Sequence, residues 1–300
     1  MTETTSSPGQ GLSIIPPDLG AYISAPASIV VSGNSCTGKS GSVAEIASGC
    51  LWVVTKRNAL RAYASMILAA QQEVEEARSQ NREPSSVAVQ RSAWKLPKKV
   101  VEIPEFVQGA KGEEVRFQNG PALKQIIGTY LKGLREDPNA FTGIVFDEWS
   151  RFAQRLQEEY QRESNNDVWE ANRKLHATHR YLAKALPEAS KKSLVLICEW
   201  REPEFYKNGE IKALGGPSLP TVNMTKPLTY EMDFVFQVLV REVRDNTKDS
   251  SDGRPVTRIE RVFSTEVHPF YSRKSRDARI PPVSTDGLDK LLSKAEVFLG

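Results

Sequence analysis

The segment Gly33-Asn-Ser-Cys-Thr-Gly38-Lys39-Ser40 limits most strongly what this chain can fold into, because it carries Gly-x-x-x-x-Gly-Lys-Ser directly after a short apolar run. Its two glycines let the backbone curl so that successive N–H groups, with the positive end of the following helix, surround a phosphate. A bulky side chain would not fit at those turns. The segment therefore predicts a phosphate-binding loop between a strand and a helix, the Walker A motif.

The side chains of this loop predict ATP and Mg²⁺ as ligands. Lys39 would reach the β- and γ-phosphate oxygens and act in catalysis, and the Ser40 hydroxyl would bind the Mg²⁺ that nucleotides carry. The alternative is a Gly/Ser-rich turn without a ligand, but the strand before it and the helix-permissive stretch after it favour the loop. The expected nucleotide contacts are Gly33, Asn34, Ser35, Cys36, Thr37, Gly38, Lys39, Ser40 and Gly41.

A second strand pattern, Phe141–Glu148, ends in two carboxylates and is typical of a Walker B strand. The carboxyl ends of the strands line the ligand crevice of a doubly wound sheet, so Asp147 is expected beside the loop, holding Mg²⁺ mostly through water. Glu148 would then orient and deprotonate an attacking water as the catalytic base. The alternative is that both carboxylates only cap the helix that begins near Trp149.

Bulk composition bounds the class of protein. Hydrophobic residues at 39% and charged residues at 26% exclude wholesale disorder, and 300 residues suit one α/β domain with insertions. The net charge of +3 excludes a strongly basic protein, so any DNA contact must be a local patch. Cys36, Cys50 and Cys198 lack metal-ligand spacing, are expected to be buried thiols, and fit the cytoplasm.

The order of elements predicts a flexible tail over residues 1–19 and one domain over 20–300, with a helical insertion at about 58–99 whose part from Ser85 to Lys99 is irregular and basic. No apolar run approaches the length of a membrane span, and the tail lacks a signal-peptide core. His176 and His179 are expected on a solvated helix face rather than at a metal site. Expected strands are Ala21–Ser32, Leu51–Thr55, Val100–Val107, Phe141–Glu148, Ser193–Cys198 and Asp233–Val240, and expected helices are Lys39–Ala47, Asn58 to about Asn81, Pro121–Leu134, Trp149–Gln161 and Asp167–Leu186, the last ended by Pro187.

Further elements complete a resemblance to a known family. After Ser193–Cys198 come the polar residue Glu199, a polar loop Glu202–Lys212, the element Gly215-Gly-Pro-Ser-Leu-Pro220 and the Asp-Phe-Val strand at Asp233. This order resembles the RecA-like ATPase core, and most closely the phage RecA-like ATPases of recombination and single-strand annealing. The resemblance implies a P-loop NTPase of α/β class, with a RecA-like, mainly parallel, doubly wound sheet.

The same resemblance suggests a role for a basic segment near the C-terminus. Lys274 and Arg276, after an expected hairpin over Arg258–Phe270, resemble the Lys-x-Arg finger of RecA-like hexameric helicases. In those proteins both cations enter the neighbouring subunit's nucleotide site and neutralise charge on the transferring phosphoryl group. The alternative is a solvated basic turn that contacts nucleic-acid backbone.

Two departures from the family pattern affect the catalytic assignment. The RecA-type glutamate follows the strand between the two Walker motifs, where this chain has Lys56 and Arg57. Glu148 is therefore the leading base, and Glu105 is the weaker candidate. The switch position, commonly Gln or His in the family, is Glu199 here, so the coupling of nucleotide state to DNA binding is open.

We expect a DNA-stimulated ATPase that assembles into rings or filaments on single-stranded DNA in phage recombination or replication. Its DNA surface would include residues 201–214 and Lys95–Lys99, since cations with aromatic side chains suit base stacking. Core packing is the alternative role for those aromatic residues. A DNA-packaging or helicase-loader motor and a non-catalytic nucleotide-binding structural component are the alternative functions. The aromatic residues in question are Trp94, Trp200, Phe205 and Tyr206.

Overall fold

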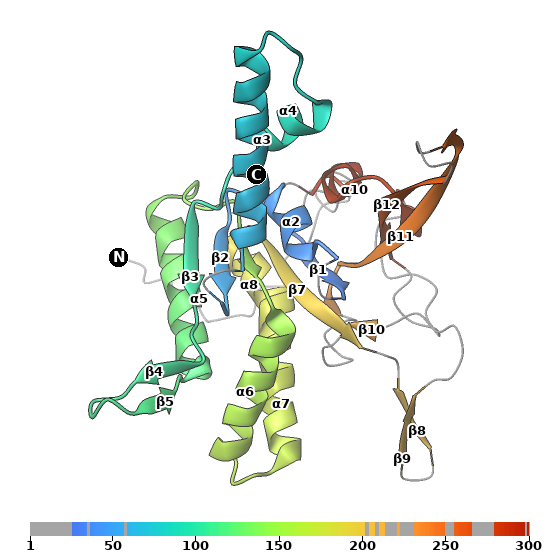
Figure 1. Ribbon diagram of the computed structural model, residues 1–300. Coiled ribbons are helices and arrows are strands. Elements are labelled where there is room, and N and C mark those ends of the chain that lie inside the picture. Colours follow the sequence, from blue (N-terminus) through green and yellow to red (C-terminus); the bar gives the residue numbers. More distant parts are fainter. Residues whose placement is uncertain are drawn as a thin grey trace, which may run out of the picture.

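A computed structural model describes residues 26–34, 37–56, 59–201, 204–207, 210–213, 221–222, 231–249, 255–265, 279–297 and 299. Its main feature is a twisted central sheet with strand order β13-β12-β11-β1-β7-β6-β2-β3 (Figure 1). The six strands from β11 to β3 are parallel, whereas β12 pairs antiparallel with β11 on one side and with β13 on the other. The strands are β1 (Ser28–Gly33), β2 (Leu51–Val54), β3 (Lys99–Glu102), β6 (Gly143–Phe146), β7 (Ser193–Arg201), β11 (Phe234–Asp249), β12 (Pro255–Ser264) and β13 (Val283–Ser284), and β10 (Thr221–Val222) pairs with β7.

Helices cover both faces of this sheet, and strands that are buried on both faces explain the near-continuous apolar runs of β1, β2, β6 and β7. One face packs on α2 (Lys39–Ala44), α3 (Arg61–Ser79) and α10 (Leu288–Lys294). The other packs on α5 (Asn119–Glu136), α6 (Trp149–Glu163), α7 (Val168–Arg180) and α8 (Leu186–Ser190). The prediction of a mainly parallel, doubly wound α/β sheet is confirmed.

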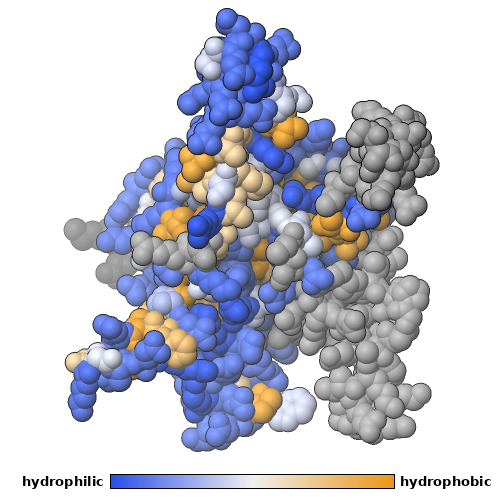
Figure 2. All heavy atoms as spheres, in the orientation of Figure 1, coloured by the Kyte–Doolittle hydropathy of each residue, from blue (hydrophilic) through white to orange (hydrophobic). Residues whose placement is uncertain are grey.

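The helix α3 and a short second helix, α4 (Ser86–Ser92), extend away from the sheet as a pair (Figure 1). The segment from Ser85 to Lys99 was expected to be irregular, and this was wrong, because the Ser85 hydroxyl accepts the Ala88 N–H at 3.1 Å and caps α4. Ala70, Val74 and Ala88 form a small core of their own. The outer part of the pair is coloured hydrophilic in Figure 2, as expected for a surface in contact with water.

The α7 segment differs from its prediction in two ways. It continues through a π-helical turn, Tyr181–Ala185, into α8, and Pro187 does not end it but lies in the first turn of α8, where no N–H is needed. His179 does not lie on a solvated face: it is 2% exposed, its ring centroid is 5.6 Å from that of Trp149, and burial lowers its pKa to about 3.

Three hairpins differ from the sequence-based expectation. The strand expected over Val100–Val107 is divided between β3 and β4 (Phe106–Gln108), which pairs with β5 (Glu114–Arg116). The polar loop contains β8 (Glu204–Lys207) and β9 (Glu210–Ala213), and the dipeptide Asn-Gly between them is the strongest short-range hairpin signal. The hairpin expected from Arg258 is instead formed by β12 with β11.

No helix in the described part of the chain is both long enough and apolar enough to cross a membrane. The expected tail, residues 1–19, and the element Gly215–Pro220 lie outside the described residues.

Candidate functional site

The strand order brings the two Walker segments to the same edge of the sheet. The strand β1 lies between β11 and β7, and β6 lies on the far side of β7. At the end of β1, Gly33 pairs with Val238 on one side and with Glu199 on the other. A Cβ at Gly33 would lie only 2.7 Å from the Val238 carbonyl oxygen, so glycine is required at this close approach.

The loop after β1 folds around the Lys39 side chain. The Lys39 ammonium donates hydrogen bonds to the carbonyl oxygens of Gly33 at 2.9 Å and Asn34 at 2.7 Å, and the Thr37 hydroxyl donates to Asn34 at 3.0 Å. Gly38 has a φ of +82°, a left-handed conformation that a side chain would strain. The ammonium therefore lies within the curve of the loop, while Ser35 and Cys36 lie outside the described residues.

Ser40 and Asp147 join the loop to the end of β6. The Ser40 hydroxyl donates to Asp147 Oδ1 at 3.0 Å, and the Glu148 N–H donates to the same oxygen at 2.9 Å. Asp147 is 3% exposed, and its second oxygen, Oδ2, is buried without a hydrogen-bond partner among the described residues. Burial raises the pKa of Asp147 to about 6, against the hydrogen bond from Ser40, which lowers it.

These two side chains fit a hard divalent cation. A hydroxyl and a carboxylate with an unpartnered oxygen are the ligand types that Mg²⁺ prefers, usually with several waters retained. A cation here would also offset the cost of burying the Asp147 charge.

Glu148 lies next to this pair in a constrained position. Its φ of +58° places it in the left-handed region at the N-terminal end of α6, and its side chain is 30% exposed. Thr55, directly after β2, donates its hydroxyl to the Glu148 carboxylate. Lys56 and Arg151 form ion pairs with the same carboxylate at 3.7 and 3.8 Å. Residues from the ends of two neighbouring strands thus hold the carboxylate at the sheet edge.

Thr55 was not identified from the sequence. Its signal is positional: Val53 pairs with Phe146, so the residues that follow β2 and β6 emerge side by side.

Glu105, the alternative base, lies elsewhere. It follows β3, which is four strands from β1 in the sheet, a separation of roughly 19 Å at the usual strand spacing. Its carboxylate accepts a hydrogen bond from Arg155 at 2.8 Å. By contrast, the Glu199 N–H donates to the Ser150 hydroxyl at 3.0 Å, and the exposed Glu199 side chain lies at the same edge as the loop.

The residues expected to bind DNA or a neighbouring subunit are only partly described. The ring of Trp94 stacks on Tyr63 with centroids 5.5 Å apart, so this aromatic residue takes part in packing. Lys95, Lys98 and Lys99 are exposed. The side chains of Trp200, Phe205 and Tyr206, and the whole of Lys274 and Arg276, lie outside the described residues.

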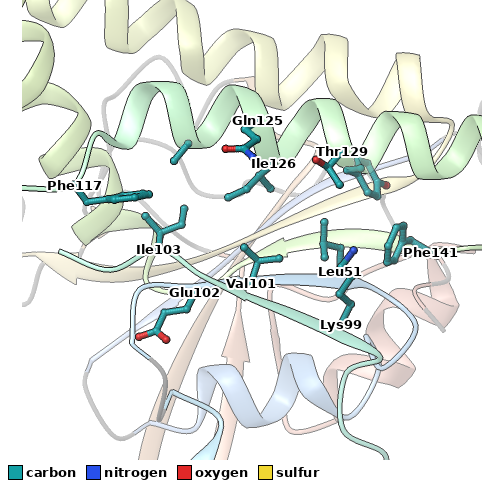
Figure 3. A pocket seen from close by; sticks show the side chains of 12 residues that line it. Leu51, Lys99, Val101, Glu102, Ile103, Phe117, Gln125, Ile126, Thr129 and Phe141 are labelled. Atoms are coloured by element: carbon teal, nitrogen blue, oxygen red, sulfur yellow. The ribbon is translucent and has the colours of Figure 1, made fainter. Parts of the chain in front are cut away.

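A cavity of about 250 Å³ lies away from this site, between the β2–β3 edge and α5. Figure 3 shows Val101 and Ile103 pointing toward α5, while Glu102 between them points to the opposite side. Neither the loop nor the two Walker carboxylates line this cavity, so it is not the candidate nucleotide site.

Comparisons with known proteins give a structural match but no sequence match. No protein-family model matches the chain, and no curated protein is significantly similar to it. Among solved structures, the crystal structure of the RadB recombinase matches with a TM-score of 0.32 and 14% identity, over 83% of this chain and 85% of that chain. A match with so low a TM-score assigns no fold family, site or activity.

Proposed function

We propose that this chain is a Mg²⁺-dependent ATPase. The observation that carries the proposal is the hydrogen bond between Ser40 and Asp147, with the buried Asp147 Oδ2 beside it. It joins a loop of Walker A spacing to a strand end of Walker B pattern, and it leaves one carboxylate oxygen for a cation. A Gly/Ser-rich turn without a ligand gives no reason for an unpartnered carboxylate oxygen in this place.

In the proposed mechanism, the loop N–H groups and Lys39 bind the β- and γ-phosphates, and Ser40 and Asp147 hold the metal ion. The metal ion would neutralise charge on the phosphoryl oxygens. Glu148 accepts a proton from the attacking water as the bond to the leaving phosphate breaks. Thr55, Lys56 and Arg151 hold the Glu148 carboxylate in place, which favours Glu148 over Glu105 as the base.

The biological role is proposed from the sequence resemblance. We propose action on single-stranded DNA in phage recombination or replication, as a ring or filament in the host cytoplasm, with Lys274 and Arg276 acting across the subunit interface. The free, buried thiols Cys50 and Cys198, whose pKa values burial raises to about 12, agree with a reducing compartment. A DNA-packaging or helicase-loader motor is the second candidate function, because such motors share the adjacent Asp-Glu pair found here at Asp147 and Glu148.

Phosphate release measured with and without single-stranded DNA tests the proposal. We expect turnover in the wild-type chain, an increase with DNA, and none with Lys39→Ala. Lys132→Ala, which changes an exposed lysine paired with Glu136 on α5, is the matched control and should behave like the wild type. Equal turnover in Lys39→Ala and wild type would refute the loop assignment. ATP turnover that DNA does not stimulate would favour the DNA-packaging or helicase-loader motor. Nucleotide binding without turnover would indicate that the nucleotide is a structural ligand of a non-catalytic protein.

A further inference from the structure

An arginine from a distant strand lies against the phosphate-binding loop. Arg261 of β12 donates a hydrogen bond from a terminal guanidinium nitrogen to the Ser42 hydroxyl at 3.0 Å, and Ser42 donates in turn to the Gly38 carbonyl at 3.1 Å. A Cβ on Gly38 would lie 3.0 Å from Arg261 Cζ and 3.2 Å from its Nε. The guanidinium thus lies directly against Gly38, whose φ of +82° disfavours a side chain at this position.

Arg261 adds a second cation to the loop, since the Lys39 ammonium is held by the Gly33 and Asn34 carbonyl oxygens and Arg261 lies against Gly38. Arginine carries five N–H donors in a planar fork that matches phosphate oxygens. The bond to Ser42 uses one of these donors, and Arg261 is exposed at the surface. The geometry therefore leaves guanidinium donors beside the loop.

The acidic neighbour of Arg261 does not fully balance it. Glu45, on the next turn of the chain after Ser42, interacts electrostatically with Arg261. Burial raises the pKa of Glu45 to about 7, against the effect of Arg261, which lowers it. Near neutral pH, Glu45 thus carries only part of a negative charge and offsets only part of the Arg261 charge.

We infer that Arg261 is a nucleotide-binding residue of the same chain, which contacts the polyphosphate on the Gly38–Ser42 side of the loop. The inference rests on the proposed nucleotide site and adds to it a second cation that lies on neither Walker motif. Arginine suits this role better than lysine, because its planar fork can bond Ser42 and a phosphate oxygen at the same time.

Equilibrium binding of ATP, ADP and inorganic tripolyphosphate to the full chain tests the inference. Arg261→Gln keeps an amide that can bond Ser42 but removes the charge, so we expect the Kd for all three ligands to rise at least about tenfold. Arg261→Lys keeps the charge but not the planar fork, so its Kd should lie between those of the wild type and the Gln variant. The melting temperature of each variant without ligand shows whether the fold is retained.

Arg241→Gln is the matched control. Arg241 is also an exposed arginine of the β11–β12 hairpin, but it pairs with Glu260 at 2.8 Å and so lies on the opposite face of the hairpin from Arg261. Its variant should bind all three ligands like the wild type.

Three outcomes would overturn the inference. If Arg261→Gln binds with wild-type affinity, Arg261 does not contact the ligand. If the Kd rises equally in the Gln and Lys variants, the role of Arg261 is packing. If the Kd rises for ATP and ADP but not for tripolyphosphate, Arg261 contacts the nucleoside and not the phosphates. Lys39→Ala separates this inference from the proposed function. If Lys39→Ala abolishes binding while Arg261→Gln does not, the nucleotide site stands and only the role of Arg261 fails; wild-type affinity in Lys39→Ala removes both.

Discussion

The Thr55 hydroxyl donates a hydrogen bond to the Glu148 carboxylate across the ends of β2 and β6, two neighbouring parallel strands. The contact fixes a partly exposed carboxylate whose other described partners are the longer ion pairs to Lys56 and Arg151. Thr55→Val should lower kcat about tenfold and leave the Kd for ATP unchanged, because orientation of the base is lost but not the phosphate contacts. Thr55→Ser keeps the hydroxyl and should restore kcat. A Val variant as fast as the wild type would show that Thr55 has no part in positioning.

Glu148→Gln should bind Mg-ATP with wild-type affinity and hydrolyse it at least about a hundredfold more slowly, the usual range for loss of a general base. Single-turnover hydrolysis with a parallel binding measurement separates the two effects. Glu105→Gln is the control and should keep full activity, since Glu105 follows β3, two strands from β6, and its carboxylate pairs with Arg155. The opposite result, slow hydrolysis by the Glu105 variant and normal hydrolysis by the Glu148 variant, would show that Glu105 is the base.

Asp147→Asn should stabilise the fold while removing Mg²⁺-dependent nucleotide binding. The pKa of Asp147 rises from 3.8 to about 6 on folding, so the folded chain binds more protons than the unfolded chain. The raised pKa therefore stabilises the fold by up to about 3 kcal/mol below about pH 4. This stabilisation is lost as the pH rises through about 6. Urea unfolding without nucleotide or Mg²⁺ should show equal stability of both proteins near pH 4 and a more stable Asn variant at pH 7. A difference in the free energy of unfolding between the two proteins that does not change with pH would contradict the raised pKa of Asp147.

Glu159 caps α5 from the neighbouring helix, since its two carboxylate oxygens accept the N–H groups of Asn119 at 2.6 Å and Gly120 at 3.0 Å. Glu159→Gln turns one acceptor into a donor that faces an N–H, so the free energy of unfolding should fall by about 1–3 kcal/mol with kcat unchanged. Chemical denaturation measures the loss. Glu158→Gln alters the preceding residue, whose ion pair with Arg116 is exposed, and should change the free energy of unfolding by less than about 1 kcal/mol. Equal effects of the two variants would show that the cap is not important.

If Lys274 and Arg276 act across a subunit interface, mixing two inactive proteins should restore activity. Arg276→Ala keeps an intact loop and Lys39→Ala keeps an intact finger, so mixed assemblies contain some complete sites. Turnover is measured at a constant total protein concentration. A mixture that stays inactive while each variant still assembles would refute the role in trans. Weaker DNA binding with a shallower salt dependence and normal basal turnover would indicate a phosphate-backbone patch instead.

The sequence was sufficient for the parts of the site that lie close together in the chain. The spacing from Gly33 to Ser40 and the carboxylates after Phe141–Phe146 predict a loop and a strand end, and parallel strand ends meet at one edge. It could not give the neighbours that depend on strand order. Arg261 is separated by 219 residues from Ser42, and no local pattern connects them.

Local signals were missed where longer patterns obscured them. Ser85 is a strong helix cap, but the basic and irregular composition after it masked α4. Spacing alone placed His179 at the surface, although the side of α7 that faces Trp149 is decided by packing against α6. Burial of a single residue on an amphipathic helix depends on the partner, which the sequence does not state.

The central place of β1 in the sheet has a consequence for the newly made chain. The Ser28 N–H donates a hydrogen bond to the Asp233 carboxylate, 205 residues later in the chain. Both strands that pair with β1, β7 and β11, come from about the last 110 residues of the sequence. During synthesis β1 therefore leaves the ribosome early, and both of its hydrogen-bonding edges stay unpaired until most of the protein has been made. The first half of the chain contains both Walker segments but neither partner strand of β1, so during synthesis the unpaired edges of β1 are open to pairing with other chains.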